Sequence, residues 1–354
     1  MRIGNREITN HGEPYFIADI AANHDGNLER AFKLIELAKE AGADVAKFQN
    51  FKAELIVSKC GFDNLGRQLS HQSSWSKSVF ETYEDASVSD EWSLKLKEKC
   101  DEVGIEYMTS PYDFASVDWA DQYVNAYKIG SGDITWPSII EYIADKKKPV
   151  LLATGASSME DVERVMAVLQ NKQTEVVLMQ CNTNYTASPE NYRYVNLSVL
   201  KTYRDRYPNV ILGLSDHTFG HSTVLGALAL GARVFEKHFT DDNDRTGPDH
   251  KFSLNPVTWR TMVDAAYELY YAMGDGVKRV EENERDTVNI QRRALYLQKD
   301  MQKGEILEKS SFFPLRPVYE GGILPYEADR IIGKKLTRDM TADSCLKWED
   351  VEDV

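Results

Sequence analysis

The sequence is poor in cysteine and in positive charge, and each shortage excludes a class of protein. Its 354 residues include four cysteines, widely spaced and without a C-x-x-C pair, so neither a disulfide framework nor a zinc ribbon is expected. Lysine and arginine number 42 against 56 aspartates and glutamates, which gives a formal net charge of −14. This balance argues against nucleic acid or an anionic membrane surface as the main partner, because both require basic patches.

Long apolar runs are also missing. No run approaches the length of a membrane span, and the first residues, MRIGNREITNHGEPYF, lack the apolar core of a secretory signal. We therefore expect a cytoplasmic protein whose cysteines are free thiols. Hydrophobic residues make up 42% of the chain, which is enough for a sizeable core, and the length favours one large domain accompanied by a small one.

Eight short apolar segments alternate with longer amphipathic ones such as Leu28–Ala41. Most are apolar almost throughout, as expected of strands that are buried on both faces. The eight segments are Tyr15–Ala21, Asp44–Gln49, Ile105–Ser110, Ala126–Ser131, Val150–Thr154, Glu175–Cys181, Val210–Asp216 and Arg233–Phe239. Eight strands, each followed by a helix, predict an α/β fold of the (β/α)8 barrel type. The alternative is a doubly wound open sheet, which usually has fewer strands.

The composition changes after residue 273. Residues 274–293, GDGVKRVEENERDTVNIQRR, are charged and poor in apolar side chains, which is typical of a linker. Residues 294–354 contain short strand-like pieces and turn signals, which indicate a small, mainly β domain. We expect the barrel to comprise residues 1–273. The small domain is close to the lower size limit for an independent hydrophobic core, so we expect it to pack against another surface.

The active site of such a barrel lies at the carboxyl ends of its strands. Reactive side chains do follow the predicted strands. They are Asp19, Lys47, Gln49, Ser110, Lys128, Ser131, Asp133, Thr183, Tyr185, Ser215, His217, Glu236 and His238. Their gathering at one end of the barrel indicates an enzyme.

Two histidines end neighbouring predicted strands. Ser215 and His217 share one face of their strand, and Glu236 and His238 share one face of theirs, because side chains alternate along a strand. Two imidazoles that converge on one point suit Mn²⁺, Zn²⁺, Co²⁺ or Fe²⁺ better than Mg²⁺. The histidines are therefore candidate metal ligands, and a purely structural role is the alternative.

Two lysines lie inside apolar segments, where a charge is costly unless it meets an anion. Lys47 and Lys128, flanked by hydroxyl side chains, suit a cradle for a phosphate and a carboxylate. One of them could instead form a Schiff base, as in a class I aldolase. The third interpretation is a pair of structural salt bridges with Asp19 or Asp133.

The acidic segment Asp241–His250, DDNDRTGPDH, invites a calcium interpretation. It fails the EF-hand pattern, because Thr246 occupies the position that requires glycine and no glutamate closes the loop. We expect a substrate-binding loop after the eighth strand, with a solvated acidic loop as the alternative.

Several segments resemble the sialic acid synthase family, which makes nonulosonic acids. They are FIADIAANHDG, AKFQ, AYKIGSGD, ATGAS, GLSDHT, EKHFTDDNDRTGPDH and RRALYLQKDMQKGEIL. The resemblance covers the chain from end to end and implies a (β/α)8 TIM barrel followed by an antifreeze-like SAF domain of the β-clip type. It also implies a domain-swapped homodimer, in which Arg316 reaches the sugar site of the partner subunit.

The resemblance further implies a role for each candidate residue. His217 and His238 would bind a divalent metal, usually Mn²⁺ in the family, with Mg²⁺ and Co²⁺ as alternatives. Asp19 and Asp133 would perform acid–base work. Phosphoenolpyruvate would be held by Lys47, Ser110, Lys128, Ser131, Thr183 and Ser215, and the sugar by Gln49, Tyr185, Asp249 and Arg316. The reaction would join C3 of phosphoenolpyruvate to an amino-sugar aldehyde and release phosphate.

Two departures from the family pattern concern the sugar. Asp19 and Asp133 stand where the family usually has glutamate, and each is one methylene shorter. N-acetylmannosamine and the 2,4-diacetamido-6-deoxyhexoses that lead to legionaminic or pseudaminic acid are the candidate substrates. Two other functions stay open: a class I aldolase or lyase that uses Lys128, and a non-catalytic carbohydrate-binding protein.

Overall fold

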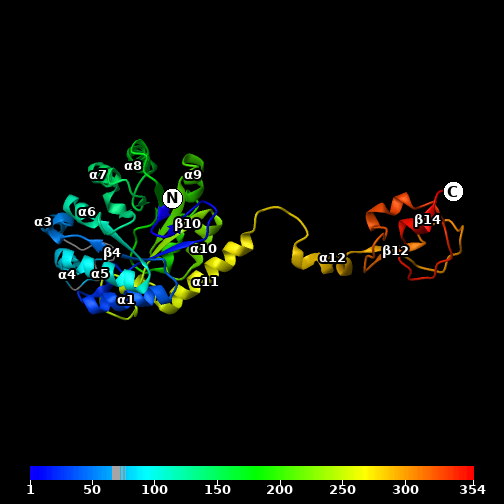
Figure 1. The fold of residues 1–354 in the computed structure, drawn as a ribbon, viewed down its shortest axis with the longest axis horizontal. Helices are drawn as coiled ribbons and strands as arrows, with labels where there is room; N and C mark the ends of the chain where they lie inside the picture. The colour runs from blue at the N-terminus through cyan, green and yellow to red at the C-terminus, as the bar shows by residue number, and fades with distance from the viewer. Residues whose placement is uncertain (66–71, 73–74, 76) are drawn as a thin grey trace. The chain divides into compact units, whose positions relative to one another are not determined.

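The chain forms two units, Met1–Gly274 and Asp275–Val354 (Figure 1). The structure is a computed structural model, and it describes residues 1–65, 72, 75 and 77–354. Each unit has its own hydrophobic core. The division falls directly after a long helix, α11 (Pro256–Met273), at the start of the charged segment.

Eight parallel strands of the first unit close into a barrel. They are β3 (Tyr15–Asp19), β4 (Val45–Asn50), β5 (Glu106–Pro111), β6 (Tyr127–Ile129), β7 (Val150–Ala153), β8 (Val176–Cys181), β9 (Ile211–Asp216) and β10 (Ala232–His238). Each strand pairs with the next one in the chain, and β10 closes the ring on β3. The predicted (β/α)8 barrel is confirmed.

A helix follows each strand and packs on the outside of the ring (Figure 1). In chain order these are α1 (Leu28–Glu40), α5 (Asp90–Val103), α6 (Phe114–Ala120), α7 (Pro137–Asp145), α8 (Met159–Asn171), α9 (Val199–Arg206), α10 (Ser222–Ala229) and α11. In α1, Asn27 accepts a hydrogen bond from the N–H of Arg30 and begins the helix. Leu34 and Ile35 of α1 are fully buried, and each such side chain stabilises the fold by about 1.5–3 kcal/mol. No helix of the described residues is long and apolar enough to cross a membrane.

Two parts of the first unit were not predicted. A hairpin of β1 (Arg2–Ile3) and β2 (Arg6–Glu7) precedes the barrel. Three short helices separate β4 from α5: α2 (Ala53–Ile56), α3 (Lys59–Asn64) and α4 (Val79–Ala86).

The interior of the barrel changes from apolar to polar along the strands. One buried cluster joins inward side chains of the amino-terminal half of the barrel, including Ile17, Val45 and Val234, with Ile3 of β1 and with Ile8, which follows β2. Two residues further along the same strands, the inward positions hold Asp19, Lys47 and Glu236. The amino-terminal half of the barrel interior is therefore filled by apolar side chains. The polar side chains can reach solvent only at the carboxyl ends of the strands.

The second unit is small and mainly β. Within the predicted linker, Arg285–Gln291 form α12. The strands are β11 (Ala294–Leu297), β12 (Phe312–Leu315), β13 (Lys335–Leu336) and β14 (Val351–Glu352), and they pair as two antiparallel ribbons. Leu295, Leu307, Ile323 and Leu346 belong to its compact core.

Candidate active site

All eight strands of the barrel contribute a side chain to one cavity at its carboxyl end. From β3 to β10 these are Asp19, Lys47, Ser110, Lys128, Ala153, Cys181, Ser215 and Glu236. We call this space the inner cavity. His217, just beyond β9, and His238, the last residue of β10, also line it. The structure therefore brings together most of the residues predicted from the sequence.

Lys47 lies between two acids. Its Nζ is 2.7 Å from Asp19 Oδ2 and 3.9 Å from Glu236 Oε2, and the lysine is 1% exposed. Burial lowers the pKa of Lys47, but the two carboxylates outweigh burial and leave the pKa above its ordinary value. Burial raises the pKa of Asp19, although Lys47 opposes this. The site therefore contains a permanent cation that faces the cavity.

Lys128 is paired with Glu236, a strand-end residue to which the sequence analysis assigned no role. Its Nζ lies 3.1 Å from Glu236 Oε1, which also accepts a hydrogen bond of 2.9 Å from Ser215. Burial acts to raise the pKa of Glu236, but Lys128 and Lys47 lower it to about 2. Glu236 Oε2 is buried without a hydrogen-bond partner. Because side chains alternate along a strand, Glu236 lies on the same face of its strand as His238. This alternation could have identified Glu236 as a site residue from the sequence.

The two histidines lie close together at the carboxyl ends of the neighbouring strands β9 and β10. Their ring centroids are 5.4 Å apart. The Nδ1 of His217 lies 2.8 Å from the carbonyl oxygen of Asn182, which fixes the ring and leaves its Nε2 for another partner. The Nε2 of His238 lies 3.6 Å from Asp19 Oδ2, and its buried Nδ1 has no hydrogen-bond partner.

These two rings fit a divalent metal by the chemistry of their nitrogens. Burial lowers the pKa of His217 to about 3 and that of His238 to about 4. Both are therefore neutral near pH 7, which is the form that coordinates metals. Among the residues described, no group of three His, Cys, Asp or Glu side chains is arranged to hold a metal by itself. A metal on this pair would keep coordination positions for water or substrate.

A larger outer cavity of about 520 Å³ adjoins the inner one. The two share Gln49, Ser131, Tyr185 and His238 as lining residues. Its other polar lining residues include Asp133, Thr183 and Asp249. Burial raises the pKa of Asp133 to about 6, with Lys128 acting in the opposite direction. The outer cavity therefore contains an acid that can exchange a proton near neutral pH.

One wall of the outer cavity is apolar. It is formed by Phe51, Ile56, Val57 and Tyr83, from the short helices after β4 and the segments beside them. The ring of Phe51 contacts the ring of Tyr83 at a centroid distance of 5.4 Å. The wall therefore comes from the part of the barrel that the strand–helix alternation did not predict.

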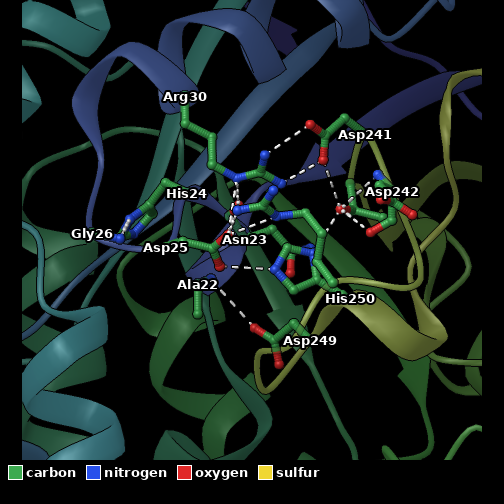
Figure 2. A network of polar contacts seen from close by, with 12 residues as sticks. Ala22, Asn23, His24, Asp25, Gly26, Arg30, Asp241, Asp242, Asp249 and His250 are labelled. Carbon is green, nitrogen blue, oxygen red and sulfur yellow. Dashed lines mark hydrogen bonds and ion pairs between the residues drawn. The ribbon is translucent and has the colours of Figure 1, made fainter.

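Ion pairs tie the acidic loop after β10 to the loop after β3 (Figure 2). Asp25 accepts from Arg245 at 2.7 Å and from His250 Nε2 at 2.8 Å. Arg30 binds Asp241 and donates to the backbone of Asn23 at 2.8 Å. The loop is therefore anchored by ion pairs, while Asp242 and Asp244 within it are exposed.

Asp249 and Arg316 complete the predicted set. Asp249 lines the outer cavity, and its Oδ2 accepts a hydrogen bond of 3.3 Å from the N–H of Ala22. Arg316 directly follows β12 in the second unit and is exposed. Its role in a partner subunit stays a prediction.

The fold and the site define a (β/α)8-barrel enzyme with lysines and histidines at the strand ends and a separate small domain. Comparison with known proteins agrees. The chain belongs to the NeuB family, whose model matches residues 34–278, and an SAF domain model matches residues 292–352. The predicted family and the predicted SAF domain are thus confirmed.

Three relatives illustrate this membership. The chain is 33% identical to an N,N'-diacetyllegionaminic acid synthase of Legionella pneumophila, over 96% of this chain and 94% of the relative. It is 32% identical to a pseudaminic acid synthase of Campylobacter jejuni, over 99% and 100%. Among solved structures, it resembles the N-acetylneuraminic acid (sialic acid) synthetase of Leptospira borgpetersenii with a TM-score of 0.72 and 26% identity, over 81% of this chain and 94% of that one.

Proposed function

We propose that this protein condenses phosphoenolpyruvate with the open-chain form of an N-acetylated hexose. The products are a sialic-acid-like 3-deoxy-2-keto acid and phosphate. The observation that carries the proposal is the inner cavity, where the buried Lys47 and Lys128 lie beside the neutral pair His217 and His238. The relatives named as legionaminic and pseudaminic acid synthases support the same reaction class.

Phosphoenolpyruvate suits the inner cavity because it carries two anionic groups. Lys47 and Lys128 are the matching cations, and a bound phosphate and carboxylate would take over contacts now made by Asp19 and Glu236. The hydroxyl groups that would donate to the same anions are those of Ser110, Ser131, Thr183 and Ser215. Ser131 already accepts a 2.9 Å hydrogen bond from Gly155 N–H, so its own proton points elsewhere.

His217 and His238 would hold the divalent metal, Mn²⁺ by the resemblance, with Mg²⁺ and Co²⁺ as alternatives. When bound, such a metal supplies Lewis-acid polarisation of the aldehyde oxygen. The carbonyl of Asn182 orients His217, and the surrounding burial keeps both imidazole rings neutral. The protein thus presents two nitrogen donors and leaves the other positions to substrate.

The reaction has a simple balance of atoms. C3 of phosphoenolpyruvate forms a bond to the aldehyde carbon, the aldehyde oxygen becomes a hydroxyl, water adds to C2, and the C–O bond to phosphate breaks. Asp19, which lines the inner cavity, would take the proton that the water releases, and Asp133, which lines the outer cavity, would exchange a proton there. Lys47 and Lys128 hold the enol in line with the aldehyde, which removes most of the entropic cost of the encounter.

The outer cavity favours a neutral sugar that carries methyl groups. Phe51, Ile56, Val57 and Tyr83 form its apolar wall, and its described lining contains two acids and no lysine or arginine. Gln49, Tyr185 and Asp249 would bind the polar groups of the sugar. We therefore favour a 2,4-diacetamido-6-deoxyhexose over N-acetylmannosamine. A higher kcat/KM for N-acetylmannosamine than for every diacetamido sugar would reject this preference.

The site is completed, in this proposal, by the small domain of a second subunit. Arg316 would enter the sugar site of a domain-swapped homodimer. Its exposure on the second unit leaves it available for such a contact.

A Schiff-base aldolase that uses Lys128 is the competing reaction. The Nζ of Lys128 lies 3.1 Å from the Glu236 carboxylate, and attack on a carbonyl carbon would require it to leave this ion pair. Borohydride reduction in the presence of pyruvate is expected to leave Lys128 unmodified. A covalent adduct at Lys128 would reject the synthase mechanism. A non-catalytic carbohydrate-binding protein, in turn, would release no phosphate with any sugar.

A further inference from the structure

Two successive residue pairs join the ends of β9 and β10. In the ladder, Ser215 is opposite Glu236, and Asp216 is opposite Lys237. Because side chains alternate along a strand, the first pair faces the inner cavity and the second faces away from it. His217 and His238 come next and line the cavity again.

The second pair, Asp216 and Lys237, is a buried ion pair that also makes hydrogen bonds to neighbouring residues. Lys237 Nζ binds Asp216 and donates to the carbonyl oxygen of Thr218 at 2.6 Å. Asp216 also accepts from the N–H of Thr218 at 3.1 Å and from the hydroxyl of Thr223 at 2.7 Å. The side chains of Lys237 and Asp216 are 1% and 2% exposed. The pair is therefore fully enclosed, and each side chain is hydrogen-bonded to more than one group.

Packing alone does not call for such a pair. Replacement of a buried ion pair by well-packed apolar side chains is often neutral or stabilising, because burying two charges costs several kcal/mol that their attraction barely returns. Asp216 and Lys237 also line neither cavity. Their distinguishing feature is their place in the chain, since each directly precedes one of the two histidines.

We propose that Asp216 and Lys237 are positioning residues that fix the separation and direction of His217 and His238. This inference rests on the proposed metal site. Asp216 and Lys237 tie the two backbones together one residue before each histidine. Thr218, the residue after His217, is held by both members of the pair. The backbone of His217 is thus restrained on both sides, and the Asn182 carbonyl restrains its ring.

The consequence is a preformed donor pair. Metal–ligand distances tolerate only a few tenths of an ångström, so a site whose donors drift must spend binding free energy to bring them together. Groups that orient the ligands typically change metal affinity by about tenfold to a hundredfold when they are removed. Loss of the Asp216–Lys237 pair therefore weakens metal binding without removing a ligand.

The test is the double variant Asp216→Asn/Lys237→Met, which removes both charges together and leaves none buried alone. The dissociation constant for Mn²⁺ is measured on the full-length, metal-free protein from the electron paramagnetic resonance signal of free Mn²⁺. We expect it to rise about tenfold or more. The visible spectrum of the Co²⁺-loaded variant is expected to change, while thermal unfolding of the metal-free protein stays within a few degrees of wild type.

The matched control is Asp44→Asn. Asp44 pairs with Arg6 at 2.7 Å and accepts from the N–H of Phe16 at 2.8 Å, at the opposite end of the barrel. This variant should bind Mn²⁺ as wild type does. An unchanged dissociation constant and an unchanged Co²⁺ spectrum in the double variant would overturn the inference.

Two further outcomes are decisive. If the double variant does not fold, Thr223→Val removes one bond to Asp216 and keeps the ion pair, and it should raise the dissociation constant for Mn²⁺ by a smaller factor. No rise in that variant would overturn the inference. If wild type itself binds no Mn²⁺, the proposed metal site fails, and the positioning role fails with it.

Discussion

His250 donates its Nε2–H to Asp25 across 2.8 Å and so joins the loop after the last barrel strand to the loop after the first. Figure 2 shows the contact within a wider network of charged side chains. Asp249, the neighbour of His250, lines the outer cavity and accepts from the Ala22 N–H of the opposite loop. The direction of Asp249 therefore depends on this tie.

Asp25→Ala should weaken use of the sugar selectively. The change removes the acceptor of His250 and Arg245 and loosens the loop that carries Asp249, while the lysines of the inner cavity stay in place. Loss of even one of these charged hydrogen bonds, each worth about 1.5–3 kcal/mol, predicts a rise of about tenfold or more in the KM for the sugar. The KM for phosphoenolpyruvate should change little. Steady-state kinetics with each substrate varied in turn measures both.

The control is Asp264→Ala, which removes an exposed ion pair with Arg260 on α11 and should leave both KM values unchanged. Equal increases in the two KM values of Asp25→Ala would contradict the assigned role.

Glu236→Gln should destabilise the empty enzyme. Lys128 would lose its buried partner, and breaking one side of such a pair costs about 3 kcal/mol or more. Phosphoenolpyruvate supplies new anions to the same lysines, so it should raise the melting temperature of the variant more than that of wild type. Thermal unfolding with and without phosphoenolpyruvate gives both quantities. Glu102→Gln, at an exposed position, is the control; equal ligand shifts in Glu236→Gln and wild type would count against the anion site.

Asp133→Asn should lower the activity of the enzyme and raise its stability at neutral pH. The folded-state pKa of Asp133, about 6, lies above its ordinary value of 3.8, so the folded protein binds this proton more tightly than the unfolded chain. Wild type therefore loses stability as the pH rises from about 4 to about 6. With a discount for partial exposure, the variant should be more stable by on the order of 1–2 kcal/mol at pH 7.5 and no more stable at pH 4.

Urea denaturation of both proteins at the two pH values measures this difference, and kcat reports the lost acid–base group. A stability difference that is the same at both pH values would show that Asp133 is not the titrating group.

Arg316→Ala and Lys128→Ala should complement each other when they are mixed. In the proposed domain-swapped dimer, one barrel keeps its lysine and receives Arg316 of the partner, so a mixed dimer has one intact site. After unfolding and refolding together, random mixing should restore about a quarter of wild-type activity. Each variant refolded alone is the control. No recovery in a mixture that contains mixed dimers would place Arg316 outside the partner's site.

The sequence was sufficient for the parts of the fold that follow a period. The strand segments were recognised because a strand covered on both faces is apolar throughout, as Val150–Ala153 is. The hairpin before the barrel was not predicted, because its strands have two residues each, which is too short to show an alternation of apolar and polar side chains. The short helices after β4 were also not predicted, because a helix such as Ala53–Ile56, barely one turn long, is too short to show a helical period.

A site residue could be predicted where its position at a strand end and the alternation of side chains along that strand determine where its side chain lies. Both rules put Lys47, Lys128 and the two histidines in one cavity. Contacts that depend on the register between strands could not be read from one segment alone. The pairing of Lys128 with Glu236, instead of Asp19 or Asp133, and the pairing of Asp216 with Lys237 are examples.

Phosphate release from phosphoenolpyruvate tests the central proposal most directly. The assay uses the full-length protein with Mn²⁺ and a panel of 2-acetamido and 2,4-diacetamido hexoses, and compares wild type with His217→Ala. We predict release that requires both a sugar and the metal, is fastest with a diacetamido-6-deoxyhexose, and is lost in the variant while its fold is retained. No release with any sugar, or undiminished release in His217→Ala, would contradict the account.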